Sequence, residues 1–164
     1  MNASIVSDEQ RRYFLDNGFI KLHQVFTPGL IARIERSVSA AVAELHNPKV
    51  KKPPNSDTSA YEAAFTQVMN IWRHSVEVRE LVFNPLLARL ASELMDVEGV
   101  RLYHDQALYK EAHGGYTPWH CDQYYWPLDS DSTITVWIPL QDTSADMGPL
   151  AFSAGSHRID LGRD

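Results

Sequence analysis

The sequence predicts an α+β domain in which helices come first and strands follow, with the strands forming a partial barrel and the helices packed outside it. Two patterns favour this class. Up to about residue 98 the chain carries helix caps and apolar residues at three- and four-residue spacing, whereas from Val100 onward its apolar and aromatic residues follow strand-like patterns. Helices followed by strands are typical of α+β folds, and 164 residues fit one domain.

The first helix is predicted from Ser7, which with Gln10 makes the pattern of a capping box, and it is expected to end near Gly18. Residues 19–26 are then predicted to form a strand. A second helix is predicted to begin at Thr27-Pro28, because the apolar residues after it recur at helical spacing and make one face suited to packing on a sheet. These residues are Leu30, Ile31, Ile34, Val38, Ala41, Val42 and Leu45.

The middle of the chain is predicted to hold a loop, an extended segment and two short helices. Residues 47–59 contain three prolines and three lysines, which is typical of an exposed connection. Residues 65–72 are predicted to be extended. The two helices are expected at 76–82, with Ser75 as the cap, and at 85–95, with Asn84 as the cap.

The segment Tyr116-Thr117-Pro118-Trp119-His120-Cys121-Asp122 carries the most informative residues. Read as a strand, it points His120 and Asp122 to one face and Cys121 to the other, where we expect the thiol to be buried behind the site. An imidazole and a carboxylate are two of the three ligands of the 2-His-1-carboxylate triad, which holds non-haem Fe(II) and leaves positions open for a cosubstrate and dioxygen. With a single cysteine in the chain, a structural zinc site of thiolates is disfavoured.

Composition and charge argue against several other classes of protein. A net charge of −6 disfavours a nucleic-acid binder, and the lysines at 49, 51 and 52 fall in the predicted loop, where they are expected to be solvated. No apolar run reaches the roughly 18 residues that a membrane span needs, and residues 1–8 lack the pattern of a secretory signal. A cytoplasmic protein is therefore expected.

Several segments around the motif follow one another in a characteristic order. They are a tyrosine-rich strand at 102–109, the Gly114-Gly115 turn, Trp119-His120-Cys121-Asp122, Tyr124-Tyr125-Trp126-Pro127, a strand at 133–140, Met147-Gly148-Pro149-Leu150 and Ala154-Gly155-Ser156-His157. This order, over residues 65–158, resembles the phytanoyl-CoA dioxygenase family, although Ala154 stands where that family usually has proline. The resemblance implies a double-stranded β-helix (jelly-roll, cupin-like) core, with residues 1–98 as a mostly helical portion and 99–164 as the first strands.

The resemblance also implies an oxidoreductase that uses Fe(II) and 2-oxoglutarate to oxidise a small organic substrate with dioxygen, releasing succinate and CO2. His120 and Asp122 would ligate the metal. Gln106, Trp137 and, more approximately, Gln67 match cosubstrate contacts, and Lys110 shares a face with Gln106 by strand alternation. For each of these four residues a purely structural role is the alternative. The aromatic residues after the turn either line the substrate mouth or close the end of a barrel; they are Trp119, Tyr124, Tyr125 and Trp126.

In the family, a second histidine ligand and a cosubstrate-binding arginine come after the Gly-Ser-His turn, and no residue up to Asp164 matches them. We therefore expect residues 1–164 to be one C-terminally incomplete oxygenase domain, with little turnover alone and with self-association through uncovered sheet edges. His157 is expected to make a capping or loop hydrogen bond. Two alternatives stay open: a catalytically inactive binding homologue, and a cupin-type site with another metal that His104, His120 or His157 completes. His104 and His113 are further, weaker candidates for a third ligand.

Overall fold

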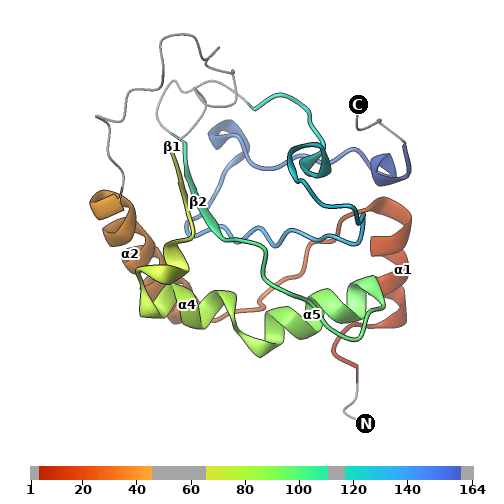
Figure 1. Cartoon of the computed structure of the whole chain (residues 1–164), viewed down its shortest axis with the longest axis horizontal. Helices are drawn as coiled ribbons and strands as arrows, with labels where there is room; N and C mark the ends of the chain where they lie inside the picture. The colour runs from red at the N-terminus through yellow and green to blue at the C-terminus, as the bar shows by residue number, and fades with distance from the viewer. Residues whose placement is uncertain (1–3, 46–65, 111–116, 160–164) are drawn as a thin grey trace. The chain divides into compact units, whose positions relative to one another are not determined.

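A computed structural model of the chain describes residues 4–45, 66–110 and 117–159 (Figure 1). The predicted loop at 47–59, the Gly114-Gly115 turn and His113 lie outside these residues. The chain divides into two compact units, unit 1 with residues 1–27, 83–101 and 121–164, and unit 2 with residues 28–82 and 102–120. The expectation of a single domain stays a prediction.

Unit 1 contains the helices α1 (Asp8–Asn17) and α5 (Pro85–Met95), which pack against each other. The predicted capping box at α1 is confirmed, because the Ser7 hydroxyl accepts from the Gln10 amide at 3.1 Å and the Gln10 side chain accepts from the Ser7 amide at 2.9 Å. Gly18 ends the helix with φ +82°, a conformation that glycine adopts without steric cost. The predicted cap of α5 is also confirmed, since the Asn84 side chain accepts from the Leu86 amide at 2.9 Å.

The chain before α1 is tied to α5 by one carboxylate. Glu93 accepts hydrogen bonds from the Ser4 hydroxyl at 2.7 Å and from the Ile5 and Val6 amides at 2.8 and 2.9 Å. The Arg89 guanidinium donates to its other oxygen at 2.7 Å. These donors, the Ser4 hydroxyl foremost, lower the pKa of Glu93 to about 2. Val6, in the attached segment, is buried.

Unit 2 contains α2 (Pro28–Leu45), α4 (Val76–Val82) and the short 3-10 turn η1 (Ile71–Arg73). Both predicted helices are confirmed. The apolar face of α2 packs on α4 and η1, so the expectation of a sheet as its main partner is wrong. A hydrogen bond of 2.7 Å between the hydroxyls of Ser39 in α2 and Tyr109 connects this helix to the later strand segment. The buried side chains of this core are Ile34, Val38, Ala41, Val42, Ile71, Val78 and Leu81.

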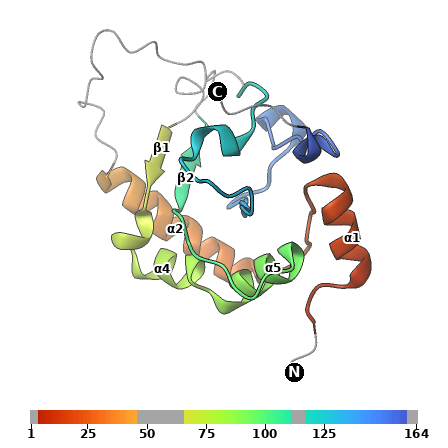
Figure 2. The same ribbon diagram turned by 45° about the vertical axis from the view of Figure 1, so that its right-hand side comes forward.

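The strands of unit 2 are β1 (Thr66–Met69) and β2 (Gln106–Tyr109), which pair antiparallel with Thr66 opposite Tyr109 and Met69 opposite Gln106 (Figures 1 and 2). Directly opposed residues share a face of an antiparallel pair. One face therefore carries the buried Ala107. The other carries four exposed side chains: Gln67, Met69, Gln106 and Leu108.

Two predicted strands are not formed, and a third is shorter than predicted. Residues 19–26 and 133–140 have no regular structure, and the predicted strand at 102–109 is reduced to β2. A strand exists only where a neighbouring segment satisfies its backbone groups, and within the described residues β1 and β2 form the one ladder. The implied double-stranded β-helix is thus not confirmed by this sheet of two strands.

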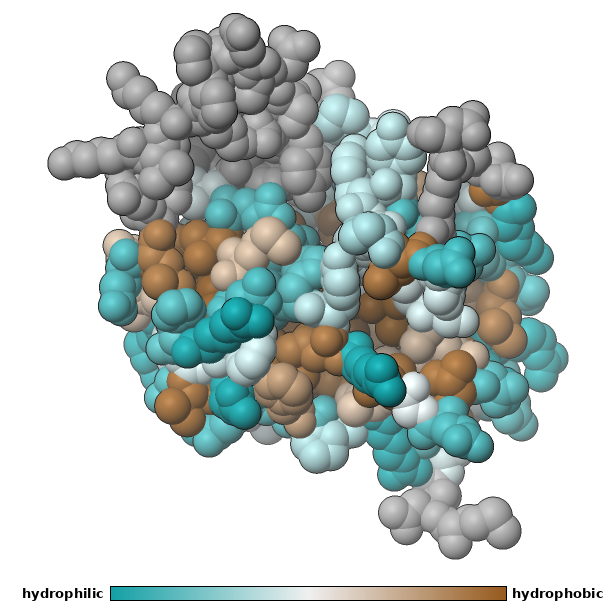
Figure 3. Space-filling model, in the orientation of Figure 1, coloured by the Kyte–Doolittle hydropathy of each residue, from teal (hydrophilic) through white to brown (hydrophobic). Residues whose placement is uncertain are grey.

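The segment 121–159 has an exposed surface with many apolar residues. None of its residues is buried, and exposed side chains include Val136, Trp137, Leu150, Phe152 and Ile159. Apolar (brown) atoms lie among polar ones on the surface drawn in Figure 3. In the parts of the chain that the structure describes, every helix is too short or too polar to cross a membrane.

Candidate metal centre

His120 lies at the end of unit 2, in the irregular stretch 117–121. Its Nδ1 atom is 2.8 Å from the Pro118 carbonyl oxygen. Because a carbonyl oxygen only accepts, this contact places the proton on Nδ1 and the lone pair on Nε2. A hydrogen bond from one ring nitrogen to a backbone carbonyl is the usual way in which a protein orients a metal-binding imidazole and fixes its tautomer.

Asp122 lies in unit 1, at the first position of the 3-10 turn η2 (Asp122–Tyr125). The Thr135 hydroxyl donates to its Oδ2 atom at 3.3 Å. The next residue, Gln123, bridges the loop between Asp122 and Thr135. Its side chain donates to the Ser130 carbonyl and accepts from the Thr133 hydroxyl, each at 2.6 Å. These bonds tie residues 122 and 123 to the segment 130–135.

The backbone at this motif differs from the strand that the sequence predicts. Residues 117–121 have no ladder partner and Asp122 opens a 3-10 turn, so the alternation argument for His120 and Asp122 sharing a face does not apply. Cys121 is exposed, and the expectation of its burial is wrong. Because only one residue separates His120 from Asp122, the chain itself keeps their Cα atoms within about 7 Å.

No third metal ligand joins these two among the residues that the structure describes. Within those residues, no group of three or more His, Cys, Asp or Glu side chains is arranged to hold a metal ion. His157, one of the candidates, places Nε2 3.1 Å from the Leu15 carbonyl oxygen, so the predicted capping hydrogen bond is confirmed. His104 instead packs its ring edge-on against Tyr103 at 4.9 Å.

The structure brings two of the four predicted cosubstrate contacts together. Gln67 of β1 and Gln106 of β2 lie on the exposed face of the sheet, and the Gln67 amide nitrogen donates to the Gln106 side-chain oxygen at 2.5 Å. This leaves the amide hydrogens of Gln106 and the amide oxygen of Gln67 to be aimed at a ligand from the same face. Met69 and Leu108 flank the pair.

The other two predicted cosubstrate contacts, Lys110 and Trp137, lie in segments without regular secondary structure. Lys110 is exposed one residue beyond the end of β2, and Trp137 is exposed within 133–140. Tyr124 and Tyr125 of η2 are 64% and 61% exposed, and their rings meet edge to face at 5.4 Å. Such aromatic rings close to the carboxylate are suited to contact a bound organic molecule.

Asp105 holds the start of β2 in place, and the sequence patterns did not single it out. Its carboxylate accepts from the Ile71 amide at 3.1 Å and the Trp72 amide at 3.3 Å, and its carbonyl oxygen accepts from the Asn70 amide at 2.8 Å. Burial raises the pKa of this carboxyl above its ordinary value. Asp105 therefore fixes the chain directly before Gln106. The sequence feature that could have indicated this role is an acidic residue directly before a strand-like segment.

Comparison with known proteins gives one family and one relative. The model of the family described as "Phytanoyl-CoA dioxygenase (PhyH)" matches residues 14–164. A protein of Stutzerimonas stutzeri, named "Probable alpha-ketoglutarate-dependent hypophosphite dioxygenase", is 26% identical over an alignment of 157 residues that covers 92% of this chain and 53% of that protein. The chain thus spans about half the length of this relative. No solved structure matches. Since the family model covers most of the sequence, including His120 and Asp122, the chain belongs to the phytanoyl-CoA dioxygenase (PhyH) family.

Proposed function

We propose that this chain carries the metal-binding part of an Fe(II)- and 2-oxoglutarate-dependent dioxygenase that hydroxylates a small organic molecule. The observation that carries the proposal is the His120-x-Asp122 motif within a sequence that belongs to the PhyH family. The name of the Stutzerimonas stutzeri relative, an alpha-ketoglutarate-dependent dioxygenase, supports the same cosubstrate.

The donor types fit Fe(II). A neutral imidazole with its lone pair on Nε2 and an ionised carboxylate are the ligands that a facial triad combines. The hydrogen bond to Pro118 orients the His120 ring, and the Thr135 hydroxyl orients the Asp122 carboxylate. When bound, Fe(II) would let dioxygen oxidise 2-oxoglutarate to succinate and CO2 and hydroxylate a C–H bond of the substrate, with one oxygen atom entering succinate and the other the product. The third protein ligand is expected outside the described residues.

The exposed face of the β1–β2 pair is proposed to receive the cosubstrate. Gln106 can donate its amide hydrogens to a carboxylate oxygen, and Gln67 holds the Gln106 amide in place through the bond of 2.5 Å. Lys110 follows directly after the end of β2 and is proposed to supply a positive charge to the anion. Trp137 is proposed as an apolar wall. Substrate contacts are assigned to Tyr124 and Tyr125, which are exposed next to Asp122.

The decisive experiment is a titration with Fe(II), with and without 2-oxoglutarate, of the protein expressed from its full reading frame in the absence of dioxygen. An oxygenase should bind the two cooperatively and show a visible charge-transfer band only when both are present. Asp122→Ala should abolish the band. The matched control is Asp129→Ala, another exposed aspartate of the same segment. Succinate formation after admitting dioxygen then measures turnover, with hypophosphite as one of the substrates tried.

Other results would replace the proposal with one of its alternatives. Tight binding of Zn(II) or Mn(II) that 2-oxoglutarate leaves unchanged would favour a cupin-type site with another metal. Absence of binding by any of the three metals would favour a catalytically inactive binding homologue. The proposal also fails if Asp122→Ala and Asp129→Ala bind Fe(II) and 2-oxoglutarate equally well.

A further inference from the structure

The ladder of β1 and β2 is too short to hold its own register. A pair of four-residue strands is marginally stable by itself in water and needs packing or further bonds to persist. Register decides which side chains face outward, since a slip of one residue turns every side chain of a strand to the other face. Gln67 is opposite Leu108 and Gln106 is opposite Met69, so the bond between the two glutamines crosses the ladder on a diagonal that this register sets. Their contact therefore depends on what fixes the strands at their ends.

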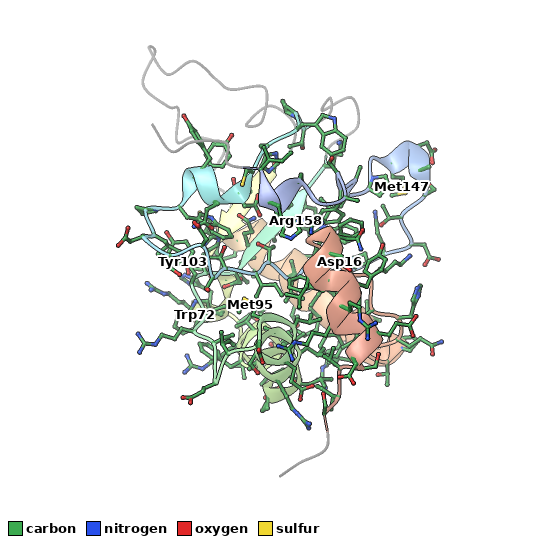
Figure 4. All side chains as sticks on the ribbon, turned by 90° about the vertical axis from the view of Figure 1, so that its right-hand side faces the viewer. Asp16, Trp72, Met95, Tyr103, Met147 and Arg158 are labelled. Carbon is green, nitrogen blue, oxygen red and sulfur yellow. The ribbon has the colours of Figure 1, made fainter. Side chains whose placement is uncertain are left out.

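The first end of β2 is fixed by Asp105. Its carbonyl oxygen accepts from the Asn70 amide at 2.8 Å, and its two carboxylate oxygens accept from the next two amides, those of Ile71 and Trp72. Ile71 is 1% exposed, so this corner is anchored in the core of unit 2. Figure 4 labels Trp72 and Tyr103, one from each of the two segments that meet here. We call Asp105 with the amides of residues 70–72 the Asp105 clamp.

The other end of β2 is fixed by a chain of hydrogen bonds to α2. Ser39 donates its hydroxyl hydrogen to the Glu35 carboxylate at 2.9 Å. A serine hydroxyl has one hydrogen, so in its contact of 2.7 Å with the Tyr109 hydroxyl Ser39 accepts and the phenol donates. All three side chains are partly buried. The bonds thus run in one direction, from the last residue of β2 through Ser39 to Glu35, and we call these three residues the Tyr109 clamp.

We infer that the two clamps position the Gln67–Gln106 pair for the cosubstrate, and that Asp105 and Tyr109 are positioning residues of that site; the inference rests on the proposed function. The clamps lie at the two ends of β2, and neither uses a side chain of its exposed face. The Gln106 amide hydrogens therefore stay available to a carboxylate while the backbone that carries them is held. Without either clamp, the fraction of molecules with the binding arrangement falls, and the apparent dissociation constant rises in proportion.

Tyr109→Phe tests the inference, because it removes one hydroxyl and leaves the ring. In the full-length protein without ligand, hydrogen–deuterium exchange in peptides covering β1 and β2 should rise by about fivefold, the effect of one lost hydrogen bond. The dissociation constant for 2-oxoglutarate, measured by calorimetry with Fe(II) and without dioxygen, should rise by a similar factor. Fe(II) affinity should stay within about twofold, because neither His120 nor Asp122 lies on the ladder. Asp105→Asn keeps one of two acceptor oxygens and should act in the same way.

Two controls separate positioning from a general loss of stability. Tyr13→Phe removes a phenol hydroxyl from α1, in unit 1, and should change 2-oxoglutarate affinity and ladder exchange by less than about twofold. Val78→Ala opens a cavity in the core of unit 2, where Val78 is 3% exposed, and should lower the free energy of unfolding at least as much as Tyr109→Phe does. Its 2-oxoglutarate affinity should nevertheless stay within about twofold of the unmodified protein. A merely structural role of the clamps would instead make affinity follow stability.

The inference is overturned if Tyr109→Phe and Asp105→Asn bind 2-oxoglutarate as tightly as the unmodified protein, or if Val78→Ala loses as much affinity as they do. Unchanged exchange in β1 and β2 of both clamp variants would overturn it as well. If the unmodified protein binds no 2-oxoglutarate in the presence of Fe(II), the proposed function fails, and the assignment of the clamps to a cosubstrate fails with it. The exchange data then still decide whether the two clamps hold the ladder.

Discussion

Replacement of Asp105 tests how the strand β2, which carries Gln106, is held. Asp105→Ala removes the acceptor of the Ile71 amide at 3.1 Å and of the Trp72 amide at 3.3 Å. Each lost hydrogen bond of this kind costs about 1 kcal/mol, so the free energy of unfolding should fall by about 2 kcal/mol. Asp105→Asn keeps one acceptor oxygen and should lose about 1 kcal/mol. Urea unfolding, followed by tryptophan fluorescence, measures both values.

The pH dependence of the free energy of unfolding provides a second test of Asp105. Burial raises the pKa of Asp105 in the folded protein, so the native state keeps a proton that the unfolded chain has already released. The stability contributed by this group is therefore complete below its ordinary pKa and is lost as the pH rises through the folded value. Asparagine does not titrate. The stability deficit of Asp105→Asn should accordingly be larger at about pH 3 than at about pH 7.

The control is Asp142→Asn, which changes an exposed carboxylate outside this network. It should change the free energy of unfolding by less than about 0.5 kcal/mol at either pH. The reasoning is refuted if Asp105→Ala is no less stable than this control, or if the deficit of Asp105→Asn grows as the pH rises.

Three further predictions concern the core, the N-terminus and the metal. Ile34→Ala should lower the free energy of unfolding by about 3 kcal/mol because Ile34 is fully buried, whereas the exposed Val76→Ala should cost less than about 0.5 kcal/mol; urea unfolding compares them. The lowered pKa of Glu93 means that its stabilising effect is present above its ordinary pKa and is lost as the pH falls toward about 2, so Glu93→Gln should flatten the acid side of the stability curve. Asp122→Ala should weaken Fe(II) binding at least about tenfold in calorimetry without dioxygen; equal binding would remove Asp122 from the site.

The helices of this protein could be predicted from the sequence because their signals are local. Ser7 with Gln10, Asn84 before Pro85, and the apolar spacing in 28–45 all lie within a few residues of the structure they specify, and each helix forms as predicted. The motif His120-x-Asp122 was likewise recognisable without a structure, because its residue types are those of an iron site.

Strands and their contacts depended on the tertiary structure, because a strand requires a partner that the local sequence does not name. Residues 19–26 and 133–140 have strand-like composition but no ladder, while the short β1 and β2 pair and bring Gln67 to Gln106. The same holds for His157. Its sequence turn suggested a cap, but only the fold shows that the capped helix is α1, which begins about 150 residues earlier, because hydrogen bonds between distant segments are set by packing and leave no local pattern.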